Sequence, residues 1–123
     1  MPLDAESLVR ALAGAGDVEG MLVIGLDARR QLCGVAVNRR HRALSFVKVW
    51  ELEALLRELE ACSLVVAVFP TGASRAPTAH EVEAFVGLSG RAHRAQVPLD
   101  DCIVARGRQT WSLRELSEER LGA

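Results

Sequence analysis

The stretch Leu64-Val65-Val66-Ala67-Val68-Phe69 is an uninterrupted apolar run that ends at Pro70-Thr71-Gly72. A short run of this kind, rich in valine and closed by proline and glycine, is typical of a strand buried on both faces. It is far too short to span a bilayer, so the sequence predicts no membrane association. We expect this run to be the central strand of a sheet.

Upstream of this strand, the pattern predicts a hairpin, a third strand and a helix. The apolar segments 20–25 and 32–37 flank a polar turn, which is typical of two antiparallel strands. Residues 42–49 alternate moderately and contain many β-formers, so a strand is expected there. From residue 50 the period becomes helical, with leucines on one face at 52, 55, 56 and 59.

Downstream, residues 78–81 have the spacing of a capping box, in which the Thr78 hydroxyl and the Glu81 carboxylate each accept from the other's backbone N–H. A helix should follow and bury Val82, Phe85, Val86 and Ser89. Residues 101–105 and 109–112 predict a hairpin, and 113–121 predict a closing helix. Near the N-terminus, Asp4 predicts a helix start, with a stop near Gly14 or Gly16. The expected fold class is α/β: a mixed sheet flanked by helices.

Composition favours one soluble domain spanning residues 1–123. Lys and Arg total 15 against 16 Asp and Glu, so the net charge does not favour binding to nucleic acid or to a membrane. Asp4 and Glu6 occupy the place where a signal peptide would have its basic region, which predicts a cytoplasmic location. Cys33, Cys62 and Cys102 lie in apolar stretches, so we expect buried free thiols. Trp50, at a strand–helix junction, is expected in the core.

Five short motifs occur in an order that resembles the JAB/MPN family, most closely its RadC-type domain. In chain order they are Gly25-Leu26-Asp27, the strand and loop 65–72, Pro77-Thr78-Ala79-His80-Glu81, Leu99-Asp100-Asp101-Cys102-Ile103-Val104, and Ser112-Leu113-Arg114-Glu115. The similarity covers about residues 20–116. It implies a JAB/MPN-like fold with cytidine-deaminase-like layering.

In active members of that family, two histidines and an aspartate bind zinc, and an upstream glutamate handles the proton of the zinc-bound water. The resemblance places the histidines on Ala67 and Phe69, neither of which can bind a metal, and the aspartate on Glu81. The second expected strand, 32–37, contains no carboxylate for the acid–base role. The resemblance therefore implies a member without the family's catalytic metal centre and without a cofactor.

The resulting expectation is a catalytically inactive RadC/JAB-like domain that binds a protein partner or itself. Two alternatives stay open: a metal-dependent hydrolase with a rearranged site, and a DNA-associated protein using Arg39, Arg40 and Arg42. Against nucleic acid stand the net charge of −1 and the scarcity of aromatic residues. The candidate binding residues lie on and around the central loop. They are Phe69, Pro70, Thr71, Gly72, Thr78, His80, Glu81, Asp100 and Asp101.

Overall fold

The computed structural model describes residues 4–15, 20–38, 44–70 and 75–121. These residues form five strands, four α-helices and one 3-10 turn. In chain order they are α1 (Ala5–Ala15), β1 (Gly20–Leu26), β2 (Leu32–Asn38), η1 (Leu44–Phe46), α2 (Val49–Glu58), β3 (Ser63–Phe69), α3 (Ala79–Arg94), β4 (Leu99–Arg106), β5 (Gln109–Ser112) and α4 (Leu113–Leu121).

The strands form a single mixed sheet in the order β2-β1-β3-β4-β5. The apolar run is its middle strand, β3, which is antiparallel to β1 and parallel to β4. Six of its seven residues are buried, as a strand covered on both faces requires. The predicted central strand and the mixed α/β class are therefore confirmed.

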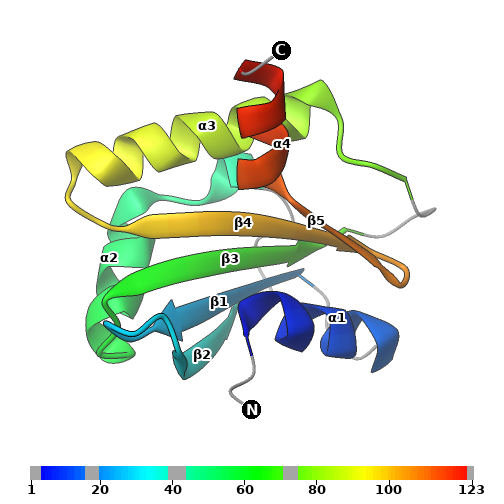
Figure 1. Cartoon of the computed structure of the whole chain (residues 1–123). Coiled ribbons are helices and arrows are strands. Elements are labelled where there is room, and N and C mark those ends of the chain that lie inside the picture. Colours follow the sequence, from blue (N-terminus) through cyan, green and yellow to red (C-terminus); the bar gives the residue numbers. More distant parts are fainter. Residues whose placement is uncertain (1–3, 16–19, 39–43, 71–74, 122–123) are drawn as a thin grey trace.

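Helices cover both faces of the sheet, with α3 on one side and α1 on the other (Figure 1). Alternate residues of β3 enter two different cores. Val66 and Val68 pack with α2, α3 and α4 residues, whereas Ala67 and Phe69 pack with Val9 of α1 and its neighbours. This alternation decides which side chains of β3 can reach a site at the start of α3.

The prediction of a strand over residues 42–49 is wrong for residues 44–49, the part of that range that the structure describes. Leu44–Phe46 form the 3-10 turn η1, and α2 already begins at Val49. The Lys48 N–H donates to Glu51 Oε1 at 3.1 Å, which fixes the start of α2. Leu44 and Val47 are buried three residues apart, a helical spacing that the alternating pattern concealed.

Trp50 and Val86 were both expected in the core, and the structure shows both exposed. Trp50 is 70% exposed, because α2 buries Leu52 and turns its second residue to the opposite side. Val86 is 50% exposed, since the buried stripe of α3 runs through Val82, Phe85, Leu88 and Ala92. Ser89 lies half-buried at the margin of that stripe.

The cysteine prediction holds for one of three residues. Cys102 is buried in β4, but Cys33 on the edge strand β2 and Cys62 before β3 are exposed, and all three thiols are free. Burial raises the pKa of the Cys102 thiol well above its ordinary value, so this thiol stays protonated and inert. No helix among the described residues is long and apolar enough to cross a membrane.

Candidate functional site

The start of α3 is built by the predicted capping box. The Glu81 N–H donates to Thr78 Oγ1 at 3.3 Å, and the Thr78 N–H donates to Glu81 Oε1 at 3.2 Å. Thr78 has the extended backbone of an N-cap residue. One oxygen of the Glu81 carboxylate is therefore committed to the helix start.

The other oxygen of Glu81 binds Arg106, the last residue of β4. Arg106 Nη2 lies 2.7 Å from Glu81 Oε2, and Arg106 Nη1 donates to the Arg75 carbonyl at 3.3 Å. The side chain of Arg106 is only 5% exposed, against 23% for Glu81. A buried guanidinium thus supplies the positive charge beside the carboxylate that the family resemblance assigns to a metal.

Arg106 was missed as a site residue because its segment reads as a turn, Arg106-Gly107-Arg108. In the structure β4 continues through Arg106, which pairs with Gln109 of β5. Cys102 and Val104 of β4 belong to the core on the α3 side. The two-residue period of the strand therefore places Arg106 on that side as well, and this period was the available signal.

A cavity of about 160 Å³ opens next to the Glu81–Arg106 pair. Its lining is mostly apolar and comes from η1, β3, α3, β4 and α4. The lining residues are Leu44, Ser45, Val68, Pro70, His80, Glu81, Ala84, Val104, Arg106 and Leu113. Sites for drug-sized ligands usually measure about 300 to 1,000 Å³, so this cavity suits a few waters or a small group better than a substrate.

The three positions that the resemblance assigns to zinc ligands do not converge. Ala67 and Phe69 are buried in the core on the α1 side, whereas Glu81 lies at the cavity on the α3 side. The β3 residues in the core on the α3 side are Leu64, Val66 and Val68, and none of their side chains has an atom that could bind a metal. Ala67, Phe69 and Glu81 therefore do not fit a zinc ion. The only strong metal-binding group among them is the Glu81 carboxylate, which already binds Arg106.

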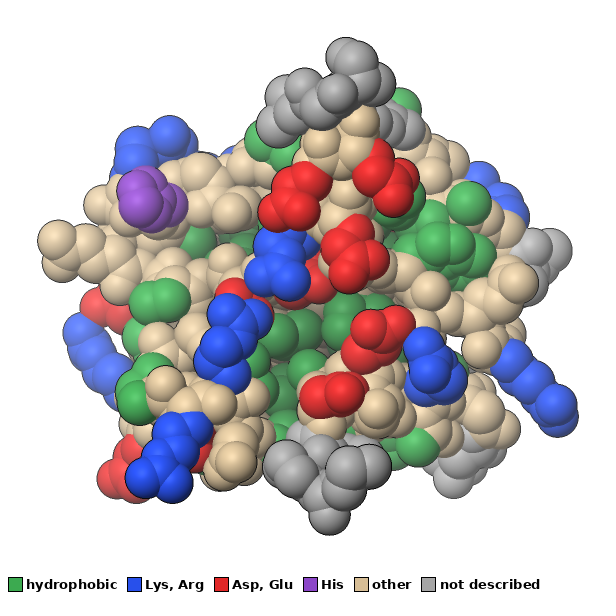
Figure 2. Space-filling view, viewed as in Figure 1, with side chains coloured by type: hydrophobic (Ala, Val, Ile, Leu, Met, Phe, Trp, Pro, Cys, Tyr) green, Lys and Arg blue, Asp and Glu red, His purple; other side chains and the backbone are tan. Residues whose placement is uncertain are grey.

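Asp100 and Asp101 lie together, although neighbouring residues of a regular strand point to opposite faces. Leu64 pairs with Leu99 and Val65 with Asp101, so Asp100 is an extra, bulged residue in β4. Both aspartates consequently line a second cavity of about 230 Å³, beside the start of α1. Figure 2 shows the molecule from the same side as Figure 1, with acidic side chains gathered along the middle of the surface and with Lys and Arg side chains and apolar surface beside them.

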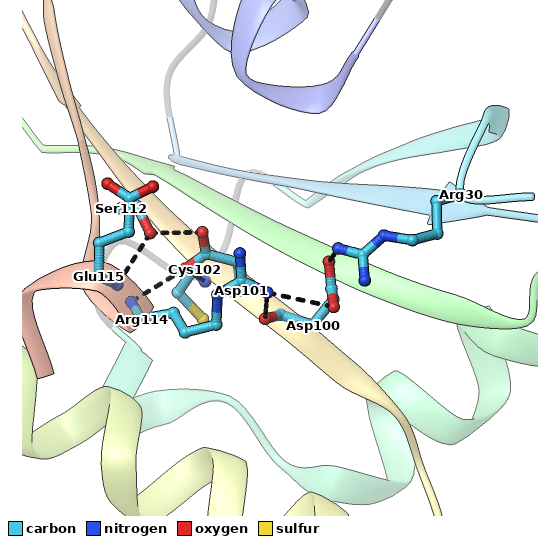
Figure 3. Close-up of polar contacts among 7 residues, drawn as sticks. All are labelled: Arg30, Asp100, Asp101, Cys102, Ser112, Arg114 and Glu115. Carbon is cyan, nitrogen blue, oxygen red and sulfur yellow. Dashed lines mark hydrogen bonds and ion pairs between the residues drawn. The ribbon is translucent and has the colours of Figure 1, made fainter. Parts of the chain in front are cut away.

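The two aspartates already have partners (Figure 3). Asp101, which is 8% exposed, accepts from Ser112 Oγ at 2.6 Å and from the Arg114 N–H at 3.0 Å. Asp100 forms ion pairs with Arg30 and with Arg114. Asp101 thus fixes the start of α4, and Asp100 links that helix to the β1–β2 turn.

The remaining predicted site residues do not form a metal centre. His80 is exposed at the rim of the smaller cavity, and Pro70 lies half-buried beside it. Thr71 and Gly72 lie outside the described residues. Within the described ranges no group of three or more His, Cys, Asp or Glu side chains is placed to hold a metal ion.

Comparison of the chain with models of known protein families and with curated proteins gave no match. What the chain shows directly is therefore its fold and two closed polar networks: Glu81 with Arg106, and the aspartates with Ser112, Arg30 and Arg114.

Proposed function

We propose that this chain is a RadC-type, JAB/MPN-like domain that does not catalyse metal-dependent hydrolysis and acts in the cytoplasm through protein contacts. Five motifs in the family's order support the assignment, together with a mixed sheet whose central strand carries the second motif. The three free cysteines agree with a reducing compartment.

The observation that carries the proposal is the buried Arg106 guanidinium 2.7 Å from Glu81. A divalent cation at this carboxylate would meet a fixed positive charge in a poorly solvated place, where like charges repel strongly. Valines occupy the adjacent strand positions that face α3. Both oxygens of the Glu81 carboxylate are occupied, one by the start of α3 and one by Arg106, so this carboxylate is not free to take a proton from a bound water.

A role in protein contacts is supported by apolar side chains that the fold leaves in solvent. Among the residues that the structure describes, the large apolar side chains that are exposed are Leu32, Val35, Val37, Phe46, Trp50 and Val86. Trp50 and Phe46, at 70% and 64% exposure, are two of only five aromatic residues in the chain. Aromatic residues are enriched where protein interfaces gain most of their binding energy.

The test is thermal unfolding with and without a chelator, together with a peptidase and isopeptidase assay supplemented with zinc, manganese or cobalt. We expect the same melting temperature with and without chelator, and no hydrolysis above the protein-free blank with any of the three ions. A melting temperature that falls on chelation, together with metal-restored hydrolysis, would overturn the proposal. Glu81→Gln serves as the control that separates enzyme activity from a contaminant.

A further inference from the structure

Helix α2 turns one of its faces to solvent. Its leucines pack into the core on the α3 side, and Figure 1 shows the helix at one flank of the molecule, beside α3. Trp50, Ala54 and Arg57 follow one another at spacings of four and three residues, so they share the opposite face, and all three are exposed. Phe46, which is 64% exposed, lies in η1 just before this helix. We call the surface of Trp50, Ala54 and Arg57 the outer face of α2.

The two ends of α2 carry charges that oppose the dipole of the helix. Lys48, the N-cap residue, places a positive charge at the positive end, and Glu58, the last residue, places a negative charge at the negative end. Both residues are exposed, and neither side chain forms an ion pair with another residue in the described part of the chain. The charges of favourable sign are already used, because Glu51 closes the helix start and Arg57 pairs with Glu53. The stability of α2 itself therefore does not account for Lys48 and Glu58.

A second α2 packed antiparallel matches this arrangement of charge. Antiparallel pairing brings Lys48 of one copy to the negative end of the other helix, close to its Glu58. If the helices cross at Ala54, Lys48 and the Glu58 of the second copy lie only about 3 Å apart along the helix axis. Two-fold symmetry repeats this ion pair at the other end of the contact. A parallel pair would instead place like charges together at both ends.

The side chains of the outer face are also self-complementary in shape. Ala54 is small, so it allows two helices to approach closely at the crossing point. Trp50 of one copy then lies beside Arg57 of the other, where the guanidinium can stack on the indole ring. The contact would cover the 70% of Trp50 that is exposed in the single chain. One surface thus holds both halves of the match, as the interface of a two-fold dimer requires.

We propose that two copies of this chain form a homodimer through antiparallel packing of the outer faces of α2. The inference rests on the proposed role in protein contacts and names a second copy of the chain as the partner. One pair of ten-residue helices buries less area than a standard interface of about 1,600 Å². The dimer should therefore be weak and its population should depend on protein concentration.

The experiment is sedimentation equilibrium of the whole chain from about 5 to about 500 µM, the range in which a weak dimer dissociates. Trp50→Lys removes the aromatic contact, and Val37→Lys, at an exposed valine of β2, is the matched control. Lys48→Glu, Glu58→Lys and the double variant test the charge pairing. Both charge changes bring the ends of α2 into line with its dipole, so neither should lower the melting temperature. A loss of dimer in these variants is then not a loss of folding.

We expect a reversible dimer whose dissociation constant rises at least about tenfold in Trp50→Lys and in each single charge variant. The double charge variant should return close to the wild-type value, because it exchanges the two charges and keeps the pairs. Salt should weaken the wild-type dimer, and Val37→Lys should leave it unchanged.

A monomer at every concentration would overturn the inference. So would a dimer that Val37→Lys abolishes and Trp50→Lys does not, or a double charge variant that dimerises no better than the single ones. None of these measurements depends on metal content or on hydrolysis. Their failure is therefore distinct from a failure of the proposed lack of catalysis, which the chelator and peptidase experiments test.

Discussion

At the scale of single residues, Glu81 shows how one carboxylate serves two structural purposes. Its Oε1 accepts from the N-cap Thr78 and its Oε2 pairs with Arg106. Burial raises the pKa of the Glu81 carboxyl, but the hydrogen bonds from Arg106 and Thr78 outweigh burial, and the pKa lies below its ordinary value of 4.5. The carboxylate is therefore held in its charged form.

The lowered pKa predicts a specific dependence of stability on pH. Because the folded pKa lies below the unfolded one, ionised Glu81 contributes stability above about pH 4.5, and that contribution is lost as the pH falls through the folded pKa. Urea unfolding of the wild-type chain and of Glu81→Gln from about pH 7 to about pH 3 measures it. The stability difference should stay constant at high pH and shrink at low pH. A difference independent of pH would refute the assignment.

At the scale of elements, the start of α4 depends on Asp101 of β4. Its buried carboxylate accepts from Ser112 Oγ and from the Arg114 N–H, while the neighbouring Asp100 pairs with the more exposed side chains of Arg30 and Arg114. Removing Asp101 would strip the helix start of its acceptor and leave donors unsatisfied.

Asp101→Ala should lower the free energy of unfolding by about 2 to 3 kcal/mol, the usual range for lost hydrogen bonds to a buried charge. The adjacent Asp100→Ala is the matched control and should cost less than about 1 kcal/mol, because its partners are solvent-screened. Urea unfolding of both variants decides the point. Equal losses for the two aspartates would contradict the assigned roles.

Local signals predicted some elements well and others poorly. The β1–β2 hairpin, the capping box and the final helix follow from short-range patterns, and the structure contains all of them. The prediction of a strand near residue 44 was wrong because the moderate alternation of apolar residues concealed the helical spacing of Leu44 and Val47. Trp50 was misplaced because a residue at a helix start can face either way, and only the position of the sheet decides.

At the scale of the whole molecule, the sheet decides which side chains lie on its α3 side and which lie on its α1 side. The mixed class and central strand followed from the apolar run, but the separation of Ala67 and Phe69 from Glu81 depends on which face α3 covers. The Glu81–Arg106 pair joins residues 25 positions apart, and no local pattern reveals such a contact. Likewise, the bulge that brings Asp100 and Asp101 to one cavity arises from pairing with β3.

The central claim is that the Arg106 guanidinium serves as the counter-charge of Glu81 where the family resemblance assigns a metal. A double-mutant cycle on Arg106→Leu and Glu81→Gln, followed by urea unfolding, measures this interaction directly. We predict a coupling energy of about 2 kcal/mol or more, since both side chains are largely withdrawn from solvent. The same cycle with the exposed Arg108→Leu should give no coupling. A coupling below about 0.5 kcal/mol for the Arg106 pair would contradict the account.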